Sequence, residues 1–249
     1  MDREMNGQSV LVTGAANGIG FEIARRFAEE GSRVFSVDIE ERGDTPGTFL
    51  RADVAIAEDV ERAFQAAGAI DILVNNAAAW AGDGYLHEVT ETVWDRVLAV
   101  SLKGVYLCSK AVLPSMMTRR SGVIINISSV NALTGLHLAA YTAAKGGVVS
   151  LTRLMARQYG QFGIRTNVIC PGTILSASSE EYYREHPEMG EELANMYPAK
   201  AFGKPEDIAE CVLYLASGKA HFLNGAVIPV DGGMSAVHRL ASLDIGDAL

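Results

Sequence analysis

The chain has 249 residues, of which 49% are hydrophobic, and a formal net charge of −9. A chain of this length buries a sizeable core, and α/β folds of this size are often single domains, so we expect one domain over residues 1–249. The acidic charge argues against partners such as nucleic acid or an anionic membrane surface, because neither attracts an acidic protein without a clustered basic patch.

The cysteine, histidine and N-terminal patterns point to a cytoplasmic protein without a metal. Cys108, Cys170 and Cys211 are far apart in apolar contexts, as expected of buried thiols in a reducing compartment. The five histidines are scattered and show no ligand spacing, so we predict no metal site. The N-terminus is polar, and we expect no apolar run long enough to span a membrane.

The first elements in chain order form a strand, a glycine turn and a helix. An apolar strand at 9–13 runs into T-G-A-A-N-G-I-G, and an amphipathic helix follows. Gly14 permits the tight turn, Gly18 lets the backbone approach a pyrophosphate, and Gly20 allows close packing of helix on strand. Glycines alone are also compatible with an ordinary turn, but the flanking strand and helix indicate a dinucleotide site.

The second strand, at 33–37, ends in Asp38, 24 residues after the first glycine of the turn. A carboxylate at this position accepts hydrogen bonds from both hydroxyls of the adenosine ribose. No arginine stands at position 15, 16 or 39 to receive a 2′-phosphate. The sequence therefore predicts NAD as the cofactor, the alternative being a solvated aspartate at the end of a strand.

The rest of the chain alternates between strands and helices. We expect strands at 48–52, 71–74, 123–127, 164–170 and 226–230, and helices at 58–67, 90–117, from 139, and from 203. An acidic and aromatic segment at 177–201 precedes the last helix and can be read as a substrate lid or as a surface helical hairpin. The alternation predicts a single doubly wound parallel sheet with helices on both faces.

The stretch 123–147 carries the candidate chemistry. Its apolar strand brings Ser128 and Ser129 to the carboxyl end of the sheet, and the helix that follows has Tyr141 and Lys145 at i and i+4, on one face. An ammonium one turn from a phenol favours the phenolate and lowers its pKa toward working pH. We therefore expect Tyr141 to be an acid/base catalyst and Ser128 to hold the substrate oxygen. Without further context, a tyrosine and a lysine at this spacing are common on helices.

The spacing of Ser128, Tyr141 and Lys145 resembles the short-chain dehydrogenase/reductase family, whose site is a serine followed thirteen residues later by Y-x-x-x-K. The resemblance covers residues 8–233 and implies a Rossmann fold. It also implies a proton relay beside a nicotinamide, with Lys145 holding the nicotinamide ribose.

The resemblance also implies further cofactor contacts. The positions concerned are Asn17, Ile19, Asp53, Val54, Asn75, Ala77, Pro171, Ile174 and Ser176. For Asn75 a structural role at the end of a strand is the alternative. Ser101 stands where the family has a catalytic asparagine credited with holding a water that links the lysine to solvent. We expect the Ser101 hydroxyl to hold that water less rigidly.

The predicted function is hydride transfer between NAD and a secondary alcohol or ketone. Glutamates of the 177–201 segment favour a neutral polyol, sugar or cyclic alcohol over a highly anionic substrate. The alternative is a dinucleotide-binding sensor or scaffold with little turnover. The resemblance implies a homotetramer, and the tail at 234–249 has apolar residues at helical spacing that either cover a neighbouring subunit or form a disordered terminus.

Overall fold

The structure is a computed structural model that describes residues 5–175 and 177–236. The prediction for Ser176 lies outside the described residues, as does the prediction for the tail beyond residue 236.

Seven parallel strands form one sheet, in the order β3-β2-β1-β4-β5-β6-β7. Their bounds are Ser9–Thr13 (β1), Arg33–Asp38 (β2), Thr48–Arg51 (β3), Ile72–Asn75 (β4), Gly122–Ile127 (β5), Ile164–Pro171 (β6) and Val227–Val230 (β7). The strand order reverses between β1 and β4, and open α/β sheets bind ligands in the crevice beyond the carboxyl ends of the strands at such a reversal. The predicted doubly wound parallel sheet is confirmed.

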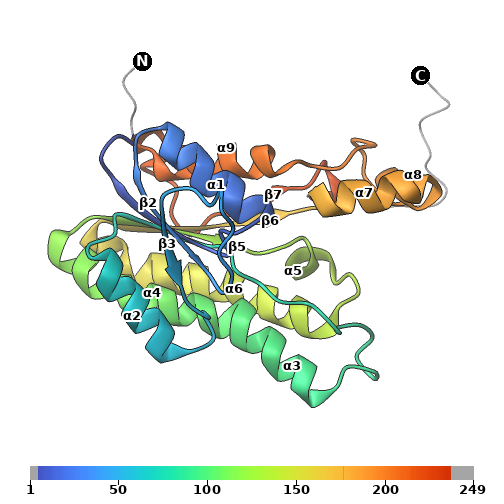
Figure 1. Ribbon diagram of the computed structural model, residues 1–249, viewed down its shortest axis with the longest axis horizontal. Helices are drawn as coiled ribbons and strands as arrows, with labels where there is room; N and C mark the ends of the chain where they lie inside the picture. The colour runs from blue at the N-terminus through green and yellow to red at the C-terminus, as the bar shows by residue number, and fades with distance from the viewer. Residues whose placement is uncertain (1–4, 176, 237–249) are drawn as a thin grey trace.

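Helices cover both faces of the sheet (Figure 1). Helices α1 (Gly18–Glu29) and α9 (Pro205–Ala216) pack together on one face, and α2 (Ala57–Ala67), α4 (Gly104–Arg119) and α6 (Ala139–Tyr159) cover the other. Each layer has its own apolar cluster with the strands. Phe27 and Val212 belong to the first, and Phe64 and Met116 to the second.

The helix predicted at 90–117 consists of α3 (Glu91–Leu98), a π-helical segment (Ala99–Lys103) and α4. Together they form a continuous helix, Glu91–Arg119, whose length and composition would allow it to cross a membrane, contrary to our expectation from the sequence. Half of its most apolar stretch is buried. Val97, Cys108 and Met116 are fully covered, as in the core helix of a globular protein.

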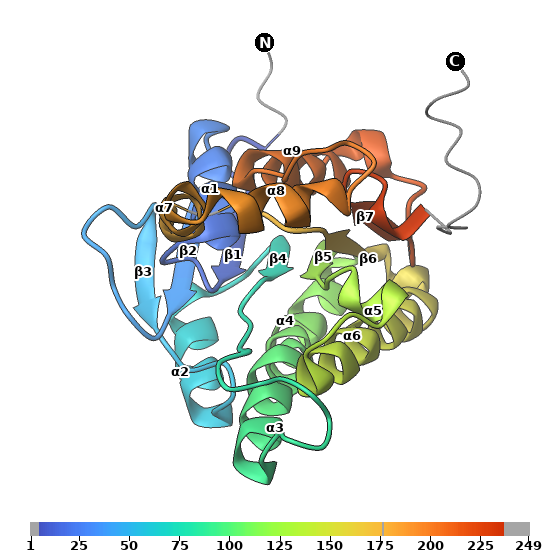
Figure 2. The ribbon, with the colours of Figure 1, turned by 90° about the vertical axis from the view of Figure 1, so that its right-hand side faces the viewer.

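The segment predicted at 177–201 forms two short helices, α7 (Ala177–Glu185) and α8 (Pro187–Asn195), which project beyond the carboxyl ends of the strands (Figure 1, Figure 2). The chain on either side of them is fixed to the body. The hydroxyl of the buried Tyr197 accepts a hydrogen bond from the Thr173 amide at 2.9 Å, and Ile174 pairs with Gly203 in an isolated bridge. A short helix, α5 (Asn131–Thr134), follows β5.

Candidate active site

The glycine turn after β1 is built so that no side chain fits in two of its three glycine positions. A Cβ on Gly14 would lie 2.8 Å from Cα of Ala77, and one on Gly20 would lie 2.0 Å from the carbonyl oxygen of Gly14. Gly18 has φ +54°, and no atom stands within 4 Å of where its Cβ would be. The turn therefore leaves open space in front of the N-terminus of α1, where free N–H groups favour an anion such as a pyrophosphate.

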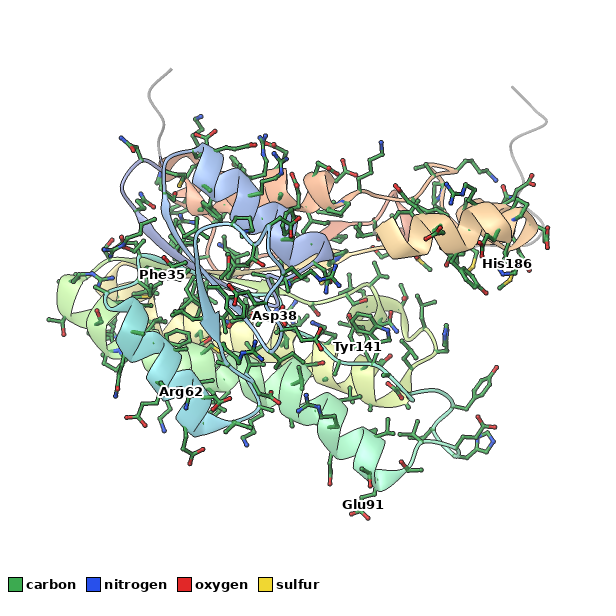
Figure 3. All side chains as sticks on the ribbon, in the orientation of Figure 1. Phe35, Asp38, Arg62, Glu91, Tyr141 and His186 are labelled. Carbon is green, nitrogen blue, oxygen red and sulfur yellow. The ribbon has the colours of Figure 1, made fainter. Side chains whose placement is uncertain are left out.

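A cavity of about 780 Å³ extends from this turn across the carboxyl ends of the strands. Figure 3 labels two residues of its wall, Asp38 at the end of β2 and Tyr141 on α6. Most of the predicted site residues line it, namely Gly14, Asn17, Gly18, Ile19, Asp38, Asp53, Val54, Ala77, Ser128, Tyr141, Lys145, Pro171 and Ile174. Residues that the sequence analysis did not single out also line it, among them Trp80 and Arg96.

The carboxylate of Asp38 is held at the cavity by the backbone. Oδ2 accepts the Ala16 N–H at 2.9 Å and Oδ1 accepts the Ile39 N–H at 2.8 Å. These bonds fix a negative charge at the end of β2. A 2′-phosphate at this point would meet that charge, whereas ribose hydroxyls can donate to it.

Asp53 forms the other acidic part of the cavity wall, and it is paired. Its Oδ2 accepts a hydrogen bond from Nη1 of Arg96 at 2.9 Å. The two residues are 43 positions apart, so nothing in the local sequence of either one indicates the pair.

The structure corrects the prediction for Asn75. Its side chain is buried and donates to Oδ1 of Asn126 at 2.8 Å and to Oγ of Ser109 at 3.2 Å, inside the protein rather than in the cavity wall. Asn76 lines the cavity instead, and its amide donates to the carbonyl oxygens of Thr13 and Gly14, both at 3.0 Å. Successive residues at the end of a strand point to opposite sides, so the structural alternative holds for Asn75.

Lys145 is fully buried and approaches Tyr141 as the helical spacing predicts. Its Nζ donates to the carbonyl oxygen of Ile127 at 2.7 Å and lies 5.4 Å from the centre of the Tyr141 ring. Burial disfavours the ammonium and lowers the pKa of Lys145 to about 8.

The pKa of Tyr141 differs from the expectation. Burial raises the pKa of Tyr141 to about 12, and a hydrogen bond with the Ser129 side chain acts in the opposite direction. The prediction that the pKa of this phenol lies below its usual value is therefore wrong for this structure, because desolvation of the phenolate outweighs the hydrogen bond with Ser129. A lysine that is itself readily neutralised by burial contributes less positive charge at neutral to alkaline pH.

The structure brings Ser129, not Ser128, to the Tyr141 hydroxyl. Ser128 Oγ donates to the carbonyl oxygen of Lys145 at 2.9 Å, while Ser129 hydrogen-bonds to the Tyr141 side chain and donates to Oδ1 of Asn131 at 3.1 Å. Neighbouring residues at the end of a strand face opposite sides, so only one of the two serines can face Tyr141. That serine is Ser129, twelve residues before Tyr141, whereas the family spacing of thirteen residues had pointed to Ser128.

Ser101 occupies a different role from the predicted one. It lies in the π-helical segment, is fully buried, and its hydroxyl accepts the Ala79 N–H at 3.0 Å and donates to the Ala79 carbonyl oxygen at 3.2 Å. The hydroxyl's single proton is therefore already used by the backbone. Ser101 fixes the loop after β4 to the long helix.

One cavity thus joins a turn open to a pyrophosphate with a half-buried tyrosine and a buried lysine, the layout of a dinucleotide-dependent oxidoreductase. The chain belongs to the short-chain dehydrogenase/reductase family. Residues 14–235 match the family model described as enoyl-(acyl carrier protein) reductase. Members bind a nicotinamide dinucleotide, so this chain is an oxidoreductase of that family.

Relatives of the chain act on different substrates. It is 38% identical over 256 residues to 2-(S)-hydroxypropyl-CoM dehydrogenase 3 of Xanthobacter autotrophicus, covering 95% of this chain and 100% of that protein. It is 36% identical over 247 residues to 3-oxoacyl-(acyl-carrier-protein) reductase FabG of Thermotoga maritima, covering 92% and 98%. The solved structure of Thermoplasma acidophilum aldohexose dehydrogenase matches with a TM-score of 0.90 and 31% identity, covering 98% and 100%.

Proposed function

We propose that this protein transfers a hydride between NAD and a carbon that alternates between a secondary alcohol and a ketone. The observation that carries the proposal is that Tyr141, Lys145 and Ser129 share one cavity with the glycine turn. A protein that only bound the dinucleotide would not need a half-buried tyrosine and a buried lysine beside it.

The residues of the cavity fit the cofactor part by part. The turn at Gly14 and Gly18, with the N-terminus of α1, takes the pyrophosphate, and Asp38 takes the adenosine ribose. In this proposal Asp53 and Val54 contact the adenine. In this proposal Pro171 and Ile174 contact the nicotinamide end, and Lys145 contacts its ribose. The nicotinamide, when bound, supplies the hydride acceptor or donor.

The protein's own residues handle the proton. In the oxidative direction Tyr141 removes the proton of the substrate hydroxyl, and in the reductive direction it returns one to the new alkoxide. The Ser129 hydroxyl already bonds to the Tyr141 side chain, and it holds the substrate oxygen beside the phenol. In this proposal Lys145, whose Nζ lies 5.4 Å from the centre of the Tyr141 ring, stabilises the phenolate when it is protonated.

The charges of the cavity favour a neutral substrate. Among the described residues that line it, the cations are Arg96 and Lys145, and both have partners, the Asp53 carboxylate and the Ile127 carbonyl oxygen. An anionic head group would therefore have to break an existing contact to find a cation. Exposed glutamates of α8, such as Glu188 and Glu191, add negative charge beside a hollow on that helix. A polyol, sugar or cyclic alcohol is the proposed class.

The test is Tyr141→Phe with a substrate panel. The panel contains sugars, polyols and cyclic alcohols, with an acyl-carrier thioester and a sulfonate-bearing alcohol as anionic comparators. We expect Tyr141→Phe to lose nearly all turnover and to retain NAD affinity, because the variant loses the proton carrier and keeps the ring. Parental turnover in this variant would refute the role of Tyr141. Cofactor binding without turnover on any substrate would instead favour a sensor or scaffold.

We also propose that the protein is a cytoplasmic homotetramer in which each chain forms a single domain. The proposal is supported by exposed apolar side chains on two helices of the same layer, Tyr106 on α4 and Leu154 on α6. Such side chains are commonly covered in symmetric assemblies. Light scattering at micromolar concentration checks the assembly, and a monomer would refute it.

A further inference from the structure

Helix α6, which carries Tyr141, begins without a cap of its own. The first N–H groups of any helix lack partners inside the helix. The residue at the N-cap position is Leu138, which has no side-chain acceptor, and the first turn contains no acidic residue. Leu138 also has φ +80°, a left-handed conformation that a bulky residue adopts only when its surroundings hold it there.

A dipeptide from a distant loop supplies the missing acceptors. The Gly84 carbonyl oxygen accepts the Ala139 N–H at 3.0 Å. Asp83 Oδ1 accepts the Ala140 N–H at 3.2 Å, and Oδ2 accepts the Tyr141 N–H at 2.8 Å. The next amide, that of Thr142, bonds to Leu138 and begins the regular helix. The first three N–H groups of α6 are therefore all bonded to residues 83 and 84.

The same loop also contacts the Tyr141 ring. Trp80 lies edge-on to it, with ring centroids 6.2 Å apart and an interplanar angle of 81°. The Asp83 N–H donates to the Trp80 carbonyl oxygen at 3.0 Å, which closes the turn, and the backbone of Ala79 is held by Ser101. A continuous set of contacts thus runs from the long helix, through this loop, to the backbone and the ring of Tyr141.

We infer that Asp83 is the positioning residue for Tyr141. Its carboxylate binds the Tyr141 N–H and the preceding one, and so fixes the first turn of α6, from which the phenol reaches the cavity. Without the carboxylate, the Ala140 and Tyr141 N–H groups would lose their acceptors next to a strained Leu138. The first turn would then be free to fray, and the phenol would lose its fixed position. This inference rests on the proposed acid/base role of Tyr141 and adds a residue that does not line the cavity.

The main experiment compares Asp83→Ala with a matched loss of a helix cap elsewhere. Thr90 caps α3 through its Oγ1, which accepts the Val93 N–H at 3.3 Å, so Thr90→Ala removes a cap that does not touch Tyr141. Both variants should lower Tm by about 2–4 °C. Asp83→Ala should lower kcat roughly 10²-fold, the cost of a small misplacement of a catalytic group, with NAD affinity unchanged. Thr90→Ala should keep the parental kcat.

Rescue and amide exchange complete the test. Asp83→Asn keeps one acceptor oxygen and should have a kcat between those of Asp83→Ala and the parent. Hydrogen exchange of the Ala140 and Tyr141 amides should quicken by at least ~10-fold in Asp83→Ala and stay slow in Thr90→Ala. The inference would be overturned by a parental kcat in Asp83→Ala or by an equal loss of kcat in Thr90→Ala. It would also be overturned if Asp83→Asn recovered no kcat, or if amide exchange in Asp83→Ala were unchanged.

These outcomes are separate from a failure of the proposed function. If Tyr141→Phe keeps parental turnover, the proposed role of Tyr141 fails, while the exchange experiment still reports whether Asp83 fixes the first turn of α6. If Tyr141→Phe is inactive and Asp83→Ala is fully active, only the positioning role is wrong.

Discussion

The two adjacent serines after β5 allow a sharp test of the site, because they differ in what their hydroxyls bind. Ser129 hydrogen-bonds to the Tyr141 side chain, and Ser128 donates to the Lys145 carbonyl oxygen at 2.9 Å. Both are buried, with exposed fractions of 9% and 2%, so both alanine variants remove a small polar group from a similar environment. They should therefore separate catalysis from stability.

The magnitudes follow from these partners. Ser129→Ala removes the hydroxyl that bonds to Tyr141 and that, in the proposed function, holds the substrate oxygen. Loss of a hydrogen-bonding group of this kind typically costs about 10²–10³-fold in kcat. Ser128→Ala removes one neutral hydrogen bond to the backbone, worth about 1 kcal/mol of unfolding free energy, and should leave kcat within a few-fold of the parent. Steady-state formation of reduced cofactor gives kcat, and urea titration gives the free energy of unfolding.

Each variant is the control for the other. If Ser128→Ala loses turnover while Ser129→Ala retains it, the spacing of thirteen residues identifies the catalytic serine after all, and the placement of the two side chains described above is wrong. Equal losses in both variants would mean that the loop after β5 acts only through its shape.

Two further predictions concern the charges of the site. We expect the parent to prefer NAD over its 2′-phosphorylated form by ~1–3 kcal/mol, and Asp38→Ala should shrink that preference. Titration of both cofactors measures it, and equal binding of the two by the parent would contradict the role of Asp38. The folded-state pKa of Lys145, about 8, lies below its ordinary value of 10.5, so between these pH values the unfolded chain holds more protons and stability rises with pH. Lys145→Met lacks this dependence, and its stability relative to the parent should fall by on the order of 3 kcal/mol between pH 7 and pH 10.5 in urea titrations. A difference that does not change with pH would show that Lys145 keeps its ordinary pKa.

The amino-acid sequence by itself determined the elements and their order. Periodicity and glycine spacing predicted the strands to within about two residues, since a buried parallel strand and an amphipathic helix each impose a pattern that a single chain displays locally. The sequence likewise predicted the glycine turn of Gly14, Gly18 and Gly20, and the position of Tyr141 and Lys145 on one face of α6. In each case the residues that interact are neighbours in the chain.

Tertiary structure alone decided the features that depend on distant partners. Which of Ser128 and Ser129 faces Tyr141, and which of Asn75 and Asn76 faces the cavity, depends on how each strand ends against its neighbours, because a shift of one residue reverses the side. The pKa of Tyr141 depends on burial that many elements create together. Asp83 caps a helix more than fifty residues further along the chain. Nothing in its local sequence marks it, because the N–H groups it accepts become its neighbours only once the sheet has formed.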